Sequence, residues 1–206
     1  MTVRRVIGGY RTCDGLSDLG RRQAERLRRR LAETEEYEAD VLVASNFARA
    51  IETAEIIRPA FGEIEIEIDA AVGEHDPGPE LDGMSFVDYV DRFGTPDWAG
   101  DPHLEMFPGG ETTAEFHLRV GAAVSRLVRT HAGSTIAVAC HGGVVDAAFR
   151  HFMRFPAAGG FALRTANCSL TEFVIPTDGP AVLARYNDAA HLAGLPEGTA
   201  RQQNPG

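Results

Sequence analysis

The spacing of apolar residues predicts a helix followed by a buried strand near the start of the chain. Ser17 is a good N-cap residue, and Leu27 and Leu31 follow it at helical intervals. We therefore expect a helix that runs from Ser17 to about Glu36. Residues 41–44 are a short run of apolar, β-favouring residues, which is typical of a strand covered on both faces.

A second helix and a second strand are predicted next. Asn46 is expected to cap the helix, whose apolar residues repeat at helical spacing and face the core. Glu and Ile alternate strictly from Glu63 to Ile68, so this segment is expected to be a strand with one wet face, near a sheet edge. The apolar stripe of the helix comprises Phe47, Ala50, Ile51, Ala54 and Ile57.

The middle of the chain, from Glu74 to Glu111, lacks a regular apolar pattern. It is rich in Gly, Pro and Asp, and one short helix is predicted within it, from Ser85 to Phe93. A long irregular stretch inside a compact domain is usually a binding loop or a lid. We therefore expect this segment to cover a site.

The last part of the chain returns to regular elements. Residues 112–115 form a capping box at the start of a long helix. Residues 135–140 predict a second buried strand, which ends in His141, two glycines and a further helix. Residues 169–175 and 182–186 predict two strands, interpreted as an antiparallel pair.

Helices that alternate with strands predict the fold class. This order favours an α/β fold with a mainly parallel central sheet and helices on both faces. The chain of 206 residues is long enough to bury a full core and is expected to form one domain, 1–206. Residues from about 195 to 206 are polar and contain Gly and Pro, so we expect a flexible tail there.

Charge and residue composition exclude several kinds of partner. The formal net charge of −10 argues against a nucleic-acid partner, because binding to a phosphate backbone needs a basic face. The single basic stretch, Arg21 to Arg30, is interpreted as a solvated helix face. All 20 cationic residues are arginines, so an anion site must use guanidinium groups, histidine or backbone amides.

Targeting signals and cysteine spacing indicate a cytoplasmic protein. The chain has no apolar run of about 18 residues and no apolar N-terminal segment, so no membrane partner is expected. Its three cysteines, Cys13, Cys140 and Cys168, are widely spaced and odd in number. They fit neither a disulfide framework nor a metal clamp and are interpreted as free thiols.

Two residues at predicted strand and helix ends suggest an anion site. His141 follows a predicted strand, and Gly142 with the glycine behind it lets backbone amides approach a phosphate. Arg49 falls in the first turn of a predicted helix, where the macrodipole disfavours a cation unless an anion binds there. The alternatives are a loop histidine satisfied by backbone groups and a solvent-facing arginine paired with Glu52 or Asp18.

A carboxylate opens the irregular segment. Glu74 stands where it can give a proton to a leaving oxygen in phosphoester cleavage, although a plain loop carboxylate is the alternative. His75 and Asp76 follow it, but adjacent residues rarely converge on one ion, so no metal site is expected. Cys140 and His141 are neighbours on a strand and point to opposite faces, so Cys140 is expected in the core.

Several short motifs then occur in a specific order along the chain. They are residues 16–20 with 23–24, 45–50 with 53–54, Glu74 with Gly78 and Gly83, 108–111, 141–143, 167–173, 186–188 and 191–192. In this order they resemble the motifs of the histidine phosphatase superfamily, also called phosphoglycerate mutase-like, from about Arg5 to Leu192. The resemblance implies a mainly parallel α/β sandwich.

The same resemblance implies a mechanism. The family's phosphate pocket contains two arginines and two histidines, and one histidine is phosphorylated as a covalent intermediate. Arg49 matches the second arginine, His141 the second histidine, and Glu74 the general acid and base. The resemblance implies no metal and no organic cofactor.

The chain departs from the family pattern at three places. Asn46 stands in place of the usual proline and Glu52 in place of the usual glutamine. The Arg-His-Gly motif of the nucleophile belongs on a central strand upstream of Arg5, where only Met1 to Arg4 precede it. We therefore expect the nucleophile to be absent and the domain to be N-terminally incomplete, with a start codon placed too far downstream as the preferred explanation. Loss of that strand would forfeit buried side chains worth roughly 1.5 to 3 kcal/mol each.

Four functional hypotheses follow. The leading one is a phosphomonoesterase that is catalytic in its full-length form, with a small phosphorylated metabolite or phosphate as its partner. The alternatives are a pseudoenzyme that binds a phosphate ligand without turnover, a phosphoglycerate mutase-type phosphotransferase, and a structural domain with no phosphate site. The substrate and the oligomeric state stay open at this point.

Overall fold

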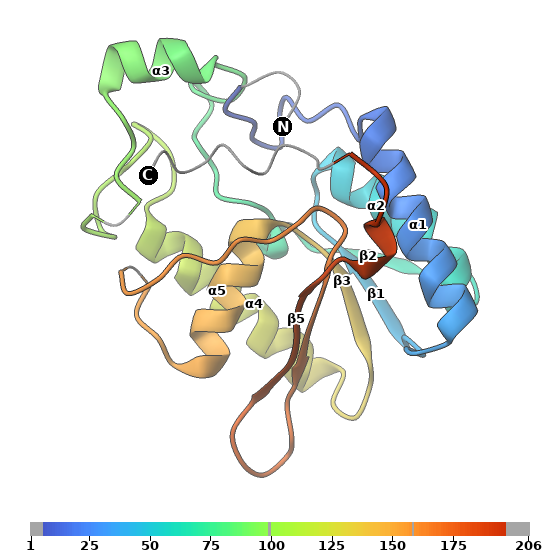
Figure 1. Ribbon diagram of the computed structural model, residues 1–206. Coiled ribbons are helices and arrows are strands. Elements are labelled where there is room, and N and C mark those ends of the chain that lie inside the picture. The colour runs from blue at the N-terminus through green and yellow to red at the C-terminus, as the bar shows by residue number, and fades with distance from the viewer. Residues whose placement is uncertain (1–5, 99, 158, 197–206) are drawn as a thin grey trace.

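A parallel sheet lies at the centre of the molecule. The computed structural model describes residues 6–98, 100–157 and 159–196 (Figure 1). Three parallel strands, β1 (Val41–Ala44), β2 (Ile66–Ile68) and β3 (Ile136–Ala139), are arranged in the order β2-β1-β3. The predicted bounds of β1 are confirmed, and its last three residues are fully buried.

Helices cover both faces of this sheet, which confirms the predicted α/β class. On one side lie α1 (Asp18–Thr34) and α2 (Ala48–Ile57), and on the other α4 (Thr113–Thr130) and α5 (Gly142–Met153) (Figure 1). Because side chains alternate along a strand, β1 serves two cores. Val43 packs with residues of α4 and α5, and Leu42 packs with residues of α1 and α2.

Side-chain caps fix where the long helices begin. The hydroxyl of Ser17 accepts from the backbone N–H of Gly20 and caps α1, as predicted. Thr112 and Glu115 form the predicted capping box of α4. The helix α1 ends at Thr34, before the expected Glu36, because the next residue turns into the left-handed region.

The predicted cap of α2 was wrong. The N-cap is Phe47 and not Asn46, and its side chain makes no capping hydrogen bond. The ring of Phe47 is buried in the core, and its backbone stays extended, so the helix starts one residue later than expected. The backbone N–H of Arg49 instead donates to the thiol sulfur of Cys13, 3.4 Å away.

Strand β2 is shorter than the sequence predicted. It begins at Ile66 and not at Glu63, because Gly62 and Glu63 both adopt left-handed backbone angles that interrupt a strand. Its predicted position at a sheet edge is confirmed by the strand order. A short 3-10 helix, Arg58–Phe61, connects α2 to this turn.

Strand β3 is less buried than predicted. Residues 135–140 were expected to form a strand covered on both faces, but the Val138 side chain is 36% exposed. Val138 lies opposite Val43 of β1, which is fully buried. The difference arises because β3 has β1 on one side and lines an open cavity on the other.

The two last strands pair with each other, apart from the parallel sheet. β4 (Leu170–Val174) and β5 (Val182–Asp188) are antiparallel, as predicted. Within the described residues they form a separate two-stranded sheet. Two further 3-10 helices, Ala70–Val72 and Ala190–Leu192, follow β2 and β5. The predicted tail falls largely on residues 197–206, which lie outside the described residues.

The irregular segment has a small core of its own. Its helix α3 (Phe86–Phe93) is capped by Ser85, as predicted. Ile7, Leu81, Tyr89 and Phe107 pack into a cluster of buried residues beneath it. In Figure 1 this segment lies apart from the strands, beyond the sheet end where α2 and α5 begin. None of the described helices has the length and apolar character that a membrane span needs.

Candidate functional site

His141 lies at the carboxyl end of β3, where it is the N-cap residue of α5. Its side chain is buried, and its ring packs against Phe47 at a centroid distance of 4.6 Å. Nε2 lies 2.7 Å from the hydroxyl oxygen of Ser45, which follows β1. Nδ1 lies 3.2 Å from Nη2 of Arg49. Neighbouring strand ends thus bring the imidazole and the guanidinium together.

These contacts determine the protonation of His141. Arginine can only donate, so Nδ1 accepts from Arg49 and Nε2 carries the proton that points to Ser45. Burial, and then the positive charges of Arg49 and Arg119, lower the pKa of His141 well below its ordinary value. The ring is therefore neutral near pH 7. An anion bound beside it favours the protonated form of the ring.

Arg49 occupies the first turn of α2, as the sequence predicted, with its guanidinium 4.4 Å from the centroid of the Phe47 ring. Its Nη1 lies 3.4 Å from the sulfur of Cys13. Partial burial raises the pKa of the Cys13 thiol, but hydrogen bonds from the backbone N–H groups of Gly15 and Arg49, with the Arg49 charge, outweigh burial and lower it. The surroundings of the Cys13 sulfur therefore stabilise a negative charge at this position.

Glu74 approaches the same point from the irregular segment. Its Oε2 accepts from the backbone N–H of Gly143 at 3.2 Å, and its Oε1 accepts from that of His75 at 3.0 Å. Only glycine permits this approach, since a Cβ at position 143 would lie 2.2 Å from Oε1. The carboxylate thus lies at the N-terminus of α5, beside His141.

Gly142 leaves room for a ligand. A Cβ built on it would meet only Thr165 within 4 Å, at 3.9 Å. Gly142 is also the first residue of α5, where amides are free to donate to an anion. We define the phosphate pocket as Ser45, Arg49, Glu74, His141 and Gly142. Its guanidinium, imidazole and helix amides suit the recognition of a small dianion, and its carboxylate suits proton transfer.

Three contributors to this site were not predicted from the sequence. Ser45 follows the buried strand β1, and the rule that ligands bind beyond strand ends was a signal that could have found it. Arg119 donates to the carbonyl oxygens of Ala71, Gly73 and Glu74 and so holds the turn that carries Glu74. Cys13 lies far from Arg49 in the sequence, and no local pattern indicates its role.

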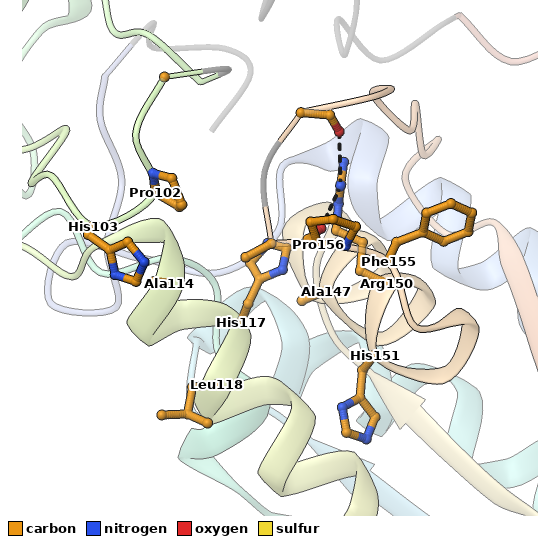
Figure 2. A pocket seen from close by; sticks show the side chains of 13 residues that line it. Pro102, His103, Ala114, His117, Leu118, Ala147, Arg150, His151, Phe155 and Pro156 are labelled. Carbon is orange, nitrogen blue, oxygen red and sulfur yellow. Dashed lines mark hydrogen bonds between the residues drawn. The ribbon is translucent and has the colours of Figure 1, made fainter.

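A second hollow contains histidine and arginine but has different chemistry. We define the histidine hollow as His103, His117, Arg150 and His151, between α4 and α5 (Figure 2). The Arg150 guanidinium donates to the Asp146 carboxylate and to the carbonyl oxygens of Pro156, Gly159 and Phe161. Its donors are therefore already used within the fold.

The described residues contain no cluster of metal-ligating side chains. Over residues 6–98, 100–157 and 159–196, no group of three or more His, Cys, Asp or Glu side chains is arranged to hold an ion. The adjacent residues Glu74, His75 and Asp76 diverge. Glu74 contacts α5, the His75 ring packs against Phe107 and Phe116, and Asp76 accepts from Arg11.

Comparisons with known proteins agree with this fold. Phosphoglycerate mutase-like protein 4 of Arabidopsis thaliana is 28% identical over 194 residues, which are 92% of this chain and 81% of that protein. A mycobacterial glucosyl-3-phosphoglycerate phosphatase superposes with a TM-score of 0.74 at 21% identity, covering 91% of this chain and 94% of the other. An alpha-ribazole phosphatase from Shigella flexneri gives 0.75 at 20% identity, covering 89% of each chain. The profile of the Histidine phosphatase superfamily (branch 1) matches residues 3–189, and the chain belongs to this superfamily.

Proposed function

We propose that this chain recognises phosphate monoesters in the phosphate pocket and that its function is phosphomonoester hydrolysis. The observation that carries the proposal is the contact between Arg49 and His141, at the N-terminus of α5. The guanidinium fork and the Gly142 amide hold the phosphoryl oxygens. Two structural neighbours are named as phosphatases, and their names support the same reaction class.

Glu74 is the group that handles the proton in this proposal. Hydrolysis forms a bond between phosphorus and the oxygen of a water molecule, which gives up a proton, and breaks the bond between phosphorus and the ester oxygen, which gains one. The Glu74 carboxyl lies beside Gly143 and therefore next to the pocket. His141, neutral before binding, stabilises the added charge when the phosphoryl group enters.

Phosphate-ligand binding without turnover is the second candidate function. In the described part of the chain, Arg49 contacts Cys13 and His141, and His141 contacts Ser45 and Arg49. No second imidazole is among these partners, so the histidine nucleophile implied by the family has no counterpart in this contact set. This observation is the support for phosphate binding without turnover as the second candidate.

A mutase-type transfer fits the chain less well. Such a reaction must hold a substrate with a second anionic group close to the phosphoryl site. The segment from Glu74 to Glu111 contains a single arginine, Arg92, among many carboxylates. The nearby Arg11 is already paired with Asp76 at 3.0 Å. The acidic cover therefore supports a phosphatase over a mutase.

Hydrolysis of an aryl phosphate by the purified chain tests the proposal. We expect turnover above background that His141→Ala abolishes and that His103→Ala, a change at an exposed histidine, leaves unchanged. Calorimetric titration with inorganic phosphate runs in parallel. Phosphate binding without hydrolysis would replace the leading function by the binding function, and absence of both would overturn the site. Interconversion of phosphoglycerate isomers would instead support the mutase.

A further inference from the structure

The two ends of the irregular segment lie against each other beside α4. The backbone N–H of Glu111 donates to the carbonyl oxygen of Asp76 at 2.9 Å, and the backbone N–H of Asp76 donates to Oε2 of Glu111 at 3.4 Å. Gly110 permits this approach, since a Cβ built on it would lie 2.7 Å from the Asp76 carbonyl oxygen. Glu111, at the far end of the segment, is thereby fixed close to the turn that carries Glu74.

Arg119, on α4, connects these two ends. Its Nε and Nη2 groups donate to the two carboxylate oxygens of Glu111 at 2.8 and 2.7 Å, which is the bidentate geometry of a strong ion pair. Its Nη1 donates to the carbonyl oxygens of Ala71 and Gly73 at 3.0 and 3.1 Å. Its Nη2 also donates to that of Glu74 at 3.4 Å. The five N–H groups of the guanidinium therefore match five acceptors.

Glu111 determines which way this guanidinium faces. The side chains of Glu111 and Arg119 are only 14% and 28% exposed, so each charge needs the other as its partner. Arg119 already contacts the main chain of Glu74. Without Glu111, the unpaired guanidinium would therefore compete with the N-terminus of α5 for the Glu74 carboxylate. The ion pair removes this competition and leaves the carboxylate to α5.

The Glu74 carboxylate is held by α5 on its other side. Its Oε2 accepts from the backbone N–H of Gly143, and α4 and α5 pack side by side on one face of the sheet (Figure 1). A carboxyl group transfers a proton only within hydrogen-bond reach of the reacting oxygen. A glutamate side chain has several rotatable bonds, so its reach depends on a fixed main chain as well as on the Gly143 amide.

We propose that Glu111 and Arg119 are positioning residues for proton transfer by Glu74. This inference rests on the proposed function. The Glu74 carboxyl gives its proton to the ester oxygen as the bond from that oxygen to phosphorus breaks, and it takes a proton from the water whose oxygen bonds to phosphorus. The ion pair keeps the carboxyl at the Gly143 amide through both transfers. Neither positioning side chain belongs to the phosphate pocket.

Two ester substrates separate proton transfer from phosphate recognition. A dinitrophenolate departs readily without a proton, whereas the phenolate of phenyl phosphate depends on one. Because a positioned proton donor contributes roughly 10²- to 10⁴-fold, we expect kcat for phenyl phosphate to fall by at least about tenfold in Arg119→Lys and in Glu111→Gln. For a dinitrophenyl phosphate we expect kcat to change by less than about twofold. KM should stay nearly the same for both esters, since the phosphate pocket is unchanged.

Matched variants control for charge and for folding. Arg119→Lys keeps the positive charge that helps to lower the pKa of His141, but it lacks the planar fork of donors. Glu111→Gln keeps the shape of the side chain and removes its charge. Arg126→Lys makes the same change about two turns further along α4, where the guanidinium pairs with Asp69, and should leave both rates unchanged. Circular dichroism checks that each variant folds.

The Gly143 amide reports on the carboxylate without any turnover. Its proton resonance can be followed by NMR, and Glu74→Ala supplies the reference for this amide without its acceptor. We expect the resonance to move toward that reference in Arg119→Lys and in Glu111→Gln. It should stay in place in Arg126→Lys.

Three results would overturn the inference. They are a Gly143 resonance that stays in place in both positioning variants, slowing that does not differ between the two esters, and the same effects in Arg126→Lys. If the unsubstituted chain turns over neither ester, the proposed function fails. The Gly143 resonance alone then decides whether the ion pair positions the Glu74 carboxylate.

Discussion

The phosphate pocket and the histidine hollow contain the same residue types and have opposite properties. Each places an arginine and a histidine at or near α5, between helices and loops. In the phosphate pocket, Arg49 contacts an imidazole nitrogen and a thiol, both of which an anion can displace. In the histidine hollow, Arg150 donates to a carboxylate and three carbonyl oxygens. Figure 2 draws two of these contacts, those with Pro156 and Gly159.

This difference shows that residue types do not make an anion site by themselves. A guanidinium binds a ligand only with donors that the fold has not already used. Arg150 is 5% exposed and ties the chain after α5 to the helix, so its role is structural. Arg49 keeps displaceable partners at a helix N-terminus, where anions are favoured. Substitutions at the two arginines separate these roles.

The largest expected effect is the loss of stability in Arg150→Met. The change leaves the carboxylate of Asp146 and three carbonyl oxygens without their buried partner, and we expect the free energy of unfolding to fall by about 3 kcal/mol. Urea denaturation measures it. Arg129→Met on the exposed surface of α4 is the control and should change stability by less than about 0.5 kcal/mol. Unchanged stability in Arg150→Met would contradict the structural role.

Arg49→Met is expected to show the reverse pattern. Loss of a charged donor should weaken phosphate binding by about 2 kcal/mol, or roughly 30-fold, with little change in stability. Calorimetric titration with inorganic phosphate measures the affinity. The folded fraction of Arg150→Met, studied without denaturant, should bind phosphate like the unsubstituted chain. If both variants bound phosphate normally, the phosphate pocket would be in the wrong place.

The pH dependence of stability tests three histidines that burial affects, of which His141 lies in the phosphate pocket and His117 in the histidine hollow. Burial lowers the pKa values of His75, His117 and His141 below the ordinary value of 6.5. Below pH 6.5 the unfolded chain takes up protons that the folded chain does not, so stability is full above this pH and falls as the pH drops. We expect a loss of about 1 kcal/mol or more between about pH 7 and about pH 5.

Variants divide this pH dependence between the regions. His141→Gln and His117→Gln should each make the dependence shallower, because each removes one buried imidazole. Denaturation curves at several pH values measure the slopes. Stability that rose on acidification over this range would show that the imidazoles are charged in the folded state.

The sequence predicted the helices, the strands and the positions of the site residues along them better than it predicted the contacts between side chains. The bounds of β1 and the cap of α1 follow from local spacing alone, as do the positions of His141 and Arg49 at a strand end and in a first helical turn. The predicted fold places these ends on one edge of the sheet, where the structure brings them together. Cys13 could not be found in this way, because a contact across 36 positions leaves no local pattern.

The openness of β3 was hidden from the sequence for a physical reason. The alternation of side chains reports on the two faces of a strand, and residues 136–139 are apolar on both. Whether a strand edge is paired depends on backbone groups, which every residue carries alike. The pattern therefore predicted a buried strand where, among the residues that the structure describes, one edge of β3 has no strand partner. The cap of α2 failed similarly, since burial of the Phe47 ring outweighed the capping preference of Asn46.

The smallest expected effect is a difference in thiol reactivity that reports on the phosphate pocket. Burial raises the pKa values of Cys140 and Cys168 to about 12 and about 11, whereas that of Cys13 is lowered by its amide and guanidinium contacts. Because the thiolate is the reactive form, iodoacetamide should label Cys13 first, as peptide mass spectrometry can show. Phosphate should slow the labelling, since it competes for Arg49.

The two arginine variants complete this test. Arg49→Met should slow labelling of Cys13 even without phosphate, because the thiolate loses its cationic neighbour. Arg150→Met should leave the labelling rate of the folded chain unchanged, since its guanidinium is occupied elsewhere. Labelling that ignored both phosphate and Arg49 would mean that the anion binds away from Cys13. The two regions would then differ in how many guanidinium N–H groups are already hydrogen-bonded, but not in function.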